Sequence, residues 1–433
     1  MWAAAQLAVS AAAAAAAASE VWVDCGSGDD SHAGTAAAPF ATLTKARDAL
    51  RDGRAAVAQQ RHVHVAAGSA CRTAHGQALT LDARDSHTAW RGAGGAVLSG
   101  GLPIAAADYQ PLTAAQRGWF KPSVRDKVKR VSLAGVADVG KLKGLSYTGG
   151  DACIRADFYE EVGLELIDAS APTAGSDLAP KVMFARFPNA VTPPQPSSWA
   201  DYRDPDNTEL ALTIDATAEQ LAAWQAQVAG GGPELWTHGL WTFNWADSHR
   251  QVLNVSAAGA SAARLALQEH GDFTDRDCQL TAAKPGAQGG HVYVYNSLHD
   301  LDQPGEYVID HAAKMAYVYP PTDSPQLEMT VATSLVVVED AEGITFEGLS
   351  FRGARGAAIV LRNSTGVVVS DGAVSDCGMS AFNVTGGSGC GLQNMSVVRA
   401  GTGGAVLEGG DRATLTPSGH FVKASQLRHS NRW

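Results

Sequence analysis

Three consecutive segments decide the fold: GITFEGLSFRGARGAAIVLRNST (residues 343–365), GVVVSDGAVSDCGMSAFNVTGGS (residues 366–388) and GCGLQNMSVVRAGTGGAVLEGGDR (residues 389–412). Each segment begins with a glycine that is followed by an apolar residue, and these glycines lie 23 residues apart. Apolar runs of three to six residues alternate with Gly, Asn, Ser and Asp, which predicts short strands separated by turns. No apolar period of 3.6 residues is sustained, which argues against helices here.

This repeat predicts a parallel β-helix. Units of 23 residues cannot bury an apolar face alone, but they can when each strand pairs with the same strand of the next unit. Apolar side chains at two sets of positions are then expected to point inward: Leu349, Val374, Val397 and Leu427 on one face, and Leu361, Val384 and Leu407 on another.

The repeat continues past the third segment. A further unit begins near Gly419, after the insertion GGDRATLTP, and the final 15 residues supply only part of a rung. An uncovered β-helix end exposes unpaired backbone groups and apolar interior. We therefore expect this chain to be the front part of a longer protein.

The sequence before the repeat predicts a cap, the first rungs and an insertion. PFATLTKARDALRDG (residues 39–53) fits an amphipathic helix that closes the β-helix core, with one apolar side: Phe40, Leu43, Ala46 and Leu50. The remaining stretches of residues 20–102 read as first rungs. Residues 103–335 break the period, and we expect an inserted, mostly β subdomain with a helix at Thr217–Ala229. The rungs resume in residues 336–433.

Composition and the N-terminus favour a secreted protein. The net charge of −11 argues against a nucleic-acid partner, because binding phosphate requires basic patches. Residues 1–19 form an Ala-rich apolar run that resembles a signal peptide, although no Lys or Arg precedes it. No other stretch predicts a membrane span. Six cysteines permit disulfides without fixing their pairing, and four glycosylation sequons agree with secretion: Asn254, Asn363, Asn383 and Asn394.

Several blocks resemble a known group of proteins. They are WVDCGSGDDSHAGTAAAPFATLTKARDAL (residues 22–50), ARFPN (185–189), LDQPGEYVID (301–310), YVYPP (317–321) and GGDRATLTP (409–417). Together they resemble secreted right-handed parallel β-helix proteins of the pectate-lyase-like superfamily. The resemblance implies an all-β fold and, for many members, activity on polysaccharides as β-helix glycoside hydrolases. In similar proteins acidic catalytic residues tend to lie on rungs after the GGDR block.

One column of the rungs carries candidate chemistry. Aligning the units on their apolar strand residues stacks a carboxylate, a guanidinium and an imidazole: Asp376, Arg399 and His429, with Arg352 within one residue. Neighbouring rungs lie about 4.8 Å apart, so such side chains can touch. We interpret Asp376 as a catalytic candidate and the cations as substrate-binding candidates. The alternative is a surface salt-bridge ladder that offsets charge repulsion between rungs.

The inserted loop carries a second set of candidates. Asp411 can act as an acid or base, Arg412 can bind a carboxylate, and Glu408 precedes them. The alternative is a turn that Asp411 caps, with Arg412 paired to it. A glycosidase needs two carboxylates, so Asp376 with Asp411, or Glu408 with Asp411, are the candidate pairs.

The sequence thus predicts a secreted carbohydrate-active β-helix protein that hydrolyses cell-wall polysaccharide. A polysaccharide lyase acting by β-elimination, with Arg399 as the base, is the first alternative. A non-catalytic glycan-binding or truncated inactive protein is the second. The expected partner is a polysaccharide, with no nucleic acid and no membrane after signal cleavage. We expect no cofactor, and no dense Asp cluster suggests calcium.

Overall fold

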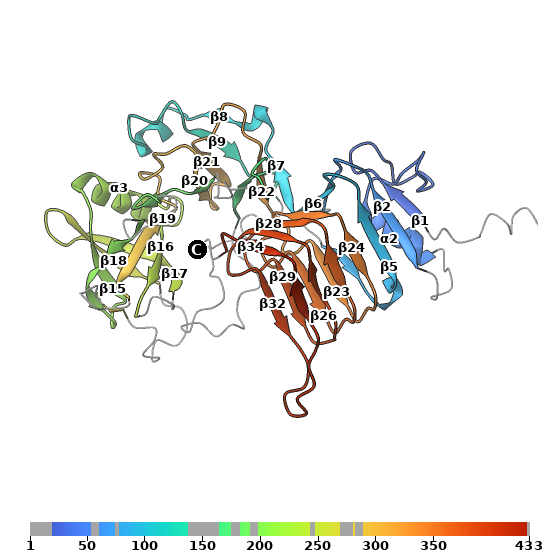
Figure 1. Ribbon diagram of the computed structural model, residues 1–433. Coiled ribbons are helices and arrows are strands. Elements are labelled where there is room, and N and C mark those ends of the chain that lie inside the picture. The colour runs from blue at the N-terminus through green and yellow to red at the C-terminus, as the bar shows by residue number, and fades with distance from the viewer. Residues whose placement is uncertain are drawn as a thin grey trace, which may run out of the picture. The chain divides into compact units, whose positions relative to one another are not determined.

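The chain forms two compact units (Figure 1). One unit joins the residues up to Gly101 with a short segment from Thr173 and the residues from Ala332, and the other comprises most residues between Leu102 and Val331. The computed structural model describes residues 20–52, 60–73, 78–136, 164–174, 182–190, 198–242, 247–268, 280–281 and 289–430. The predicted signal peptide and two of the six cysteines, Cys153 and Cys278, lie outside the described residues.

Three sheets of stacked parallel strands build the first unit. The first runs β1 (Glu20–Val23), β2 (Arg61–Val65), β5 (Thr88–Gly92), β24 (Thr345–Glu347), β27 (Val368–Ser370), β30 (Gly391–Gln393), β33 (Phe421–Lys423). The second runs β4 (Leu79–Leu81), β23 (Val336–Glu339), β26 (Ile359–Arg362), β29 (Phe382–Thr385), β32 (Ala405–Glu408). The third runs β3 (Ala70–Arg72), β6 (Val97–Ser99), β25 (Ser350–Arg352), β28 (Ala373–Cys377), β31 (Ser396–Ala400), β34 (Gln426–Arg428). The predicted parallel β-helix is confirmed.

The 23-residue period of the sequence is the spacing between residues that pair on adjacent rungs. Thr345 pairs with Val368 and Val368 with Gly391, whereas Gly391 pairs with Phe421 across the longer inserted loop. The glycines that open the units have left-handed backbones, with φ between 63° and 69°, a region that side chains with a Cβ rarely adopt: Gly343, Gly366, Gly389 and Gly419. The chain therefore needs glycine where each rung begins.

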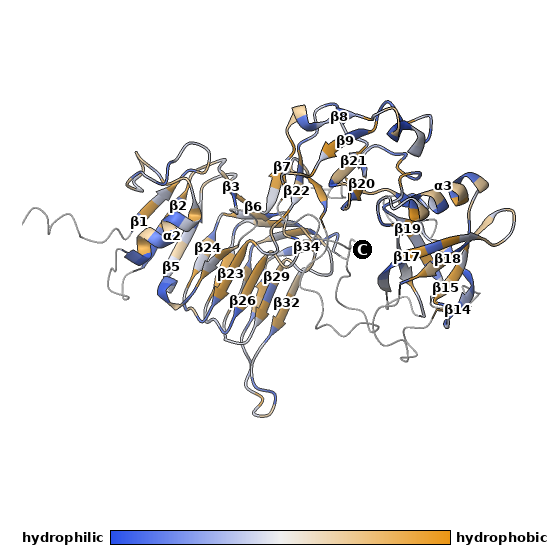
Figure 2. Cartoon of the chain, turned by 180° about the vertical axis from the view of Figure 1, so that it is seen from behind, coloured by the Kyte–Doolittle hydropathy of each residue, from blue (hydrophilic) through white to orange (hydrophobic). Residues whose placement is uncertain are grey.

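Apolar side chains fill the β-helix interior, and several of the strands that carry them, such as β23 and β26, are coloured as hydrophobic in Figure 2. Val374 and Val397 are fully buried in register, and Phe351, rather than Leu349, continues their column. Leu349, which was also expected inward, is buried in the same core. Two expected inward residues are exposed instead, Leu407 by 37% and Leu427 by 42%, because no described residue forms a further rung over them.

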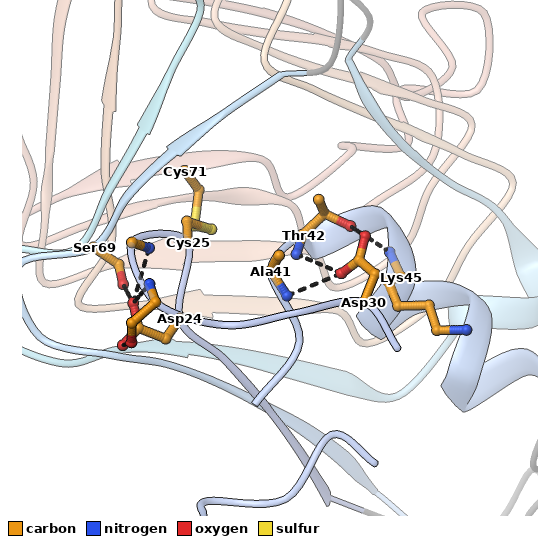
Figure 3. Close-up of a disulfide and its surroundings, with 10 residues drawn as sticks. Asp24, Cys25, Asp30, Ala41, Thr42, Lys45, Ser69 and Cys71 are labelled. Carbon is orange, nitrogen blue, oxygen red and sulfur yellow. Dashed lines mark hydrogen bonds between the residues drawn. A yellow bond between two sulfur atoms is a disulfide. The ribbon is translucent and has the colours of Figure 1, made fainter. Parts of the chain in front are cut away.

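The predicted capping helix is confirmed as α2 (Leu43–Asp52), which buries Leu43, Ala46 and Leu50 against the β-helix core. Asp30 holds the start of this helix, because its carboxylate accepts hydrogen bonds from the backbone amides of Ala41 and Thr42 at 2.9 Å each (Figure 3). A disulfide joins Cys25 to Cys71 beside it: the pairing that spacing left open. Cys377 and Cys390 are buried, and among the described cysteines neither forms a disulfide.

Antiparallel sheets dominate the second unit. One contains β11 (Met183–Phe184), β20 (Glu306–Asp310), β21 (Met315–Val318), β9 (Lys129–Ser132), β8 (Gln110–Pro111). A larger one contains β12 (Arg186–Phe187), β19 (His291–Tyr295), β16 (Trp236–Leu240), β17 (Asp247–Ala257), β18 (Ala262–Leu267), β15 (Ala211–Asp215), β14 (Arg203–Asp206), with β13 (Ala200–Asp201) on β19. A third contains β10 (Leu166–Asp168), β22 (Leu327–Thr330), β7 (Gly101–Pro103). The predicted helix is α3 (Ala218–Ala229), capped by Thr217.

Candidate functional site

A column of left-handed residues marks one corner of the β-helix. At the same position of four successive rungs the backbone has φ between 51° and 76°: Gly353, Asp376, Arg399 and His429. The pairing of Val374 with Val397, and of Val397 with Leu427, confirms the alignment that the sequence predicts. Asn, Asp and Gly tolerate this conformation best, so Arg399 is the unusual member. Strained positions persist only when the surrounding structure holds them, and they often occur at functional sites.

Asp376 and Arg399 form a buried ion pair within this column. Arg399 donates from Nε to Oδ1 of Asp376 at 2.6 Å and from Nη2 to Oδ2 at 2.9 Å. Asp376 is 5% exposed and Arg399 is 1% exposed. This two-pronged geometry fixes the plane of the carboxylate and neutralises both charges inside the protein. The predicted ladder contact therefore exists, but it is buried rather than at the surface.

The other two residues predicted to bind substrate on this sheet, His429 and Arg352, occupy different positions. His429 follows β34 at the corner position one rung beyond Arg399, and its side chain is exposed. Arg352 ends β25 and pairs in register with Ser375, which places it one residue before the corner column, as the sequence predicts. The structure thus brings Asp376, Arg399, His429 and Arg352 onto one sheet.

The GGDR insertion is a β-hairpin that Asp411 stabilises. The backbone of Asp411 exchanges two hydrogen bonds with the backbone of Thr416, at 2.8 and 2.9 Å. The Oδ1 atom of Asp411 accepts from the amide of Ala413 at 2.8 Å, and Oδ2 accepts from the hydroxyl of Thr414 at 2.8 Å. These hydrogen bonds, led by that from Thr414, lower the pKa of the Asp411 carboxyl. Among the described residues no ion pair joins Arg412 to Asp411, so the expected pairing of these two is wrong, whereas the expected turn cap is present.

The candidate carboxylates do not share one sheet. Glu408 is exposed and ends β32 in the second sheet, where it pairs in register with Thr385. Asp411 follows it on the hairpin, whereas Asp376 lies on β28 in the third sheet. Asp376 is therefore set apart from Glu408 and Asp411 by its sheet, its burial and its ion pair.

A second buried carboxyl, Glu306, lies in the other unit. It is 3% exposed, and its Oε2 accepts from the amides of Asp302 and Gln303 at 2.8 Å each. Burial raises the pKa of Glu306 to about 8, with the backbone hydrogen bonds opposing this and the nearby Asp302 and Asp300 adding to it. The Pro304–Gly305 pair in LDQPGEY predicts a turn from sequence alone, and these backbone contacts confirm it.

The second unit also contains a pocket that the sequence did not indicate. It measures about 840 Å³, and its lining includes Tyr109, Lys127, Lys129 and Tyr319. Prolines supply much of the remaining wall: Pro304, Pro320, Pro321 and Pro325. The lining comes from segments nearly 200 residues apart, so only the YVYPP block offered a signal in the sequence.

Within the part of the chain that the structure describes, no group of three or more carboxylate, imidazole or thiol side chains could hold a metal ion. Within the same residues, no helix has the length and apolar character needed to cross a membrane.

Comparison with known proteins gives a likeness of fold. No protein-family model matches the chain, and no curated protein matches it. A solved glycoside hydrolase is similar with a TM-score of 0.57 at 14% identity, over 88% of this chain and 73% of that one. The complex of XylC with xylose gives a TM-score of 0.32 at 11% identity, over 87% of this chain and 53% of that one. The first match shows a shared fold, and the second is too distant to support an argument.

Proposed function

We propose that this protein is a carbohydrate-active enzyme that hydrolyses glycosidic bonds of a cell-wall polysaccharide outside the cell. The fold that it shares with a solved glycoside hydrolase supports activity on carbohydrate. A shared fold does not specify a reaction, so the site must carry the argument. The observation that carries it is the buried Asp376–Arg399 pair at a left-handed corner of adjacent strands.

Asp376 suits the role of the ionised carboxylate in hydrolysis. Glycosidases use one carboxylate as nucleophile or base, beside a group that protonates the leaving oxygen. The two N–H groups of Arg399 hold both oxygens of Asp376, which orients the carboxylate and stabilises its charge. His429 and Arg352, on the same sheet, are the proposed sugar-binding groups. Charged and polar side chains of this kind hydrogen-bond sugar hydroxyls or carboxylates.

Hydrolysis is better supported than β-elimination. A lyase needs a base that is free to remove the proton α to a uronate carboxylate. Arg399 was the candidate base, but its Nε and Nη2 atoms donate to Asp376. A guanidinium also remains protonated throughout the physiological range. This base assignment therefore loses its support.

The compartment and the substrate are part of the proposal. The Cys25–Cys71 disulfide is typical of proteins from oxidising compartments and agrees with the signal-like run in residues 1–19. Mass spectrometry of the protein from its source, separating culture medium from cells, tests this. A form in the medium that lacks residues 1–19 is expected, and a purely cell-associated form that retains them would contradict secretion.

Release of reducing ends from a panel of cell-wall polysaccharides tests the reaction. The wild-type chain is expected to release them, and Asp376→Asn is expected to lose about 10³-fold or more of the rate, because it removes the ionised carboxylate. Asp371→Asn is the matched control, because Asp371 lies at another left-handed corner, with φ 60°, but is exposed. Circular dichroism and melting of both variants show whether they fold.

Each outcome has a meaning. Loss of activity in Asp376→Asn, with a native spectrum and an active control, supports the assignment. Full activity in Asp376→Asn would overturn the site. Products that absorb near 235 nm would identify elimination instead, and glycan binding without any turnover by the wild type would overturn the proposed reaction. If Asp376→Asn does not fold, Arg399→Lys replaces it as the test. That variant keeps the positive charge beside Asp376 but cannot donate two parallel hydrogen bonds to the carboxylate.

A further inference from the structure

The pocket of the second unit lies at one end of the five-stranded sheet. Lys129 begins β9, and Val318, its register partner, ends β21 just before Tyr319. Tyr109 follows the 3₁₀ turn Ala106–Asp108 and directly precedes β8. The strand β8 pairs with β9 on the edge opposite to β21. Paired strands thus hold the two tyrosines and the lysine in fixed relative positions. The pocket is built on sheet ends rather than on one loop.

Its walls suit the face of a sugar ring. Tyr109 and Tyr319 are half-buried, so each presents an apolar ring together with a polar hydroxyl. The prolines of the wall add rigid apolar surface, and ligand sites usually combine such surface with a few polar groups. Nζ of Lys127 lies 5.6 Å from the centre of the Tyr319 ring, which places a cation beside that aromatic face.

The charges of the pocket favour an acidic ligand. Within the described part of the chain, neither Lys127 nor Lys129 forms an ion pair. One lining carboxylate, Asp126, is paired with Arg117 at 2.8 Å, and the other, Asp323, is exposed. The two lysines thus form one basic wall of the pocket, although Asp108 and Asp168 lie near Tyr109 and the whole chain has a net charge of −11. Such a pair of lysines can attract an anionic group locally even on an acidic protein.

The hydroxyl of Tyr109 supplies a second, independent observation. Its oxygen is buried, and among the described residues it has no hydrogen-bond partner. A buried hydroxyl without a partner is costly, so a ligand that accepts from it gains free energy. Burial, with smaller contributions from Asp108 and Asp168, raises the pKa of Tyr109 to about 12, so the hydroxyl remains a donor.

We infer that this pocket binds an acidic sugar, a uronate residue of a glycan chain. Its ring would lie against Tyr109 and Tyr319, and its carboxylate would contact Lys127 and Lys129. The inference rests on the proposed function, because it names the class of substrate that the enzyme would hold while it works. It adds a binding site in the unit that lacks the Asp376–Arg399 pair.

Calorimetric titration of the whole chain tests the site with two probes of equal length, an oligogalacturonate and a neutral xylo-oligosaccharide. The oligogalacturonate is expected to bind more tightly, and the affinity is expected to fall as salt rises. The double variant Lys127→Gln/Lys129→Gln is expected to weaken binding at least tenfold, about 1.4 kcal/mol. Tyr109→Phe, which removes only the hydroxyl, is expected to weaken it several-fold.

Lys314→Gln is the matched control. Lys314 is exposed and lies in the turn between β20 and β21, at the opposite end of the same sheet. The control is expected to bind as the wild type does, and thermal melting of every variant reports its folding. Equal binding of both probes, or undiminished binding by a folded double-lysine variant, would overturn the inference. If the double-lysine variant does not fold, Tyr109→Phe decides in its place.

The same titrations separate this inference from the proposed reaction. Asp376→Asn is expected to bind the oligogalacturonate while its hydrolytic activity is lost. Uronate binding that depends on the lysines, without any reducing-end release by the wild type, would leave the pocket standing and the reaction wrong. Hydrolysis by the wild type, with uronate binding that ignores the lysines, would leave the reaction standing and the pocket wrong.

Discussion

Two of the buried carboxyl groups of this protein, one in each unit, have opposite kinds of partner. Asp376, in the β-helix, is 5% exposed and faces a guanidinium that donates two hydrogen bonds to it. Glu306, in the inserted unit, is 3% exposed and accepts from two backbone amides. Within the described residues Glu306 has no ion pair. Burial is the same for both carboxyls, and only the partner differs.

The comparison shows that the partner decides what a buried carboxyl can do. Burial in a medium of low dielectric constant disfavours a lone charge, and a pKa shift removes that charge. Glu306 follows this course, since burial raises its pKa to about 8 and leaves it mostly protonated at neutral pH. Asp376 instead faces the Arg399 guanidinium, which donates to both of its oxygens. Of the two carboxyls, Asp376 is therefore the one with a cationic partner beside it.

The largest expected effect comes from breaking the ion pair. Arg399→Met leaves the Asp376 carboxylate buried without its cation, and we expect the free energy of unfolding to fall by about 3–5 kcal/mol. Differential scanning calorimetry of the whole chain measures this as a lower melting temperature of the β-helix transition.

A double variant shows whether the charge causes that loss. Asp376→Asn/Arg399→Gln removes both charges, keeps hydrogen-bonding side chains, and places Asn where the backbone has φ 55°. We expect it to recover most of the lost stability, because no unpaired charge remains. A double variant as unstable as Arg399→Met would show that packing, not charge, holds this corner.

The second effect is a pH dependence of the inserted unit. The pKa of Glu306 is raised from 4.5 to about 8, so the folded state keeps a proton that the unfolded state loses. Its contribution to stability is complete below pH 4.5 and is lost as the pH rises through about 8. Glu306→Gln stays neutral, so it is expected to be more stable than the wild type at pH 9 by on the order of 3 kcal/mol.

Melting curves at pH 5, 7 and 9 measure the effect. The wild-type midpoint is expected to fall relative to the variant as the pH rises, and Glu328→Gln provides a control on β22, a strand of another sheet in the same unit. Equal pH dependence in Glu306→Gln and the wild type would show that Glu306 is ionised in the folded protein. The contrast with Asp376 would then disappear.

The period of the rungs explains how much of this could be predicted. A stacked fold repeats its pairing, so a 23-residue period places Val374 beside Val397 and Asp376 beside Arg399 without further information. The period does not reveal burial, because burial depends on what covers the sheet. The ion pair was therefore expected at the surface, although both residues are buried.

The inserted unit lacks such a rule. Its sheets join residues that are distant in sequence, as when Trp236 of β16 pairs with Tyr295 of β19. Antiparallel pairing at this distance leaves no period, so the sequence predicted the helix α3 but not the order of the strands in the sheets. Glu306 was recognised as part of a turn, yet its burial, and the pocket formed by residues 106–129 and 304–326, required the structure.

A smaller effect is expected at an exposed corner of the β-helix. Nδ2 of Asn394 donates to Oδ1 of Asp371 at 2.7 Å, between two left-handed residues on adjacent rungs, as Asp376 and Arg399 are. Solvent replaces this hydrogen bond when it is lost, so Asn394→Ala should cost only about 1 kcal/mol, including the strain of alanine at this φ. Asn394→Gly, which avoids the strain, isolates the hydrogen bond. A loss by calorimetry as large as that of Arg399→Met would mean that burial does not govern these corners.

The smallest effect is expected for Asp411, whose carboxylate is fully exposed and directed at its own hairpin. The hydroxyl of Thr414 and the amide of Ala413 occupy its two oxygens, and they lower its pKa. Any stability it adds is present above the usual carboxylate pKa and is lost as the pH falls through the lowered value. Asp411→Asn is expected to keep the melting midpoint and the rate of reducing-end release at neutral pH, with faster hydrogen exchange confined to the hairpin amides. A loss of turnover comparable to that of Asp376→Asn, in a folded Asp411→Asn variant, would show that this exposed carboxylate reacts. The second carboxylate that a glycosidase requires would then be Asp411.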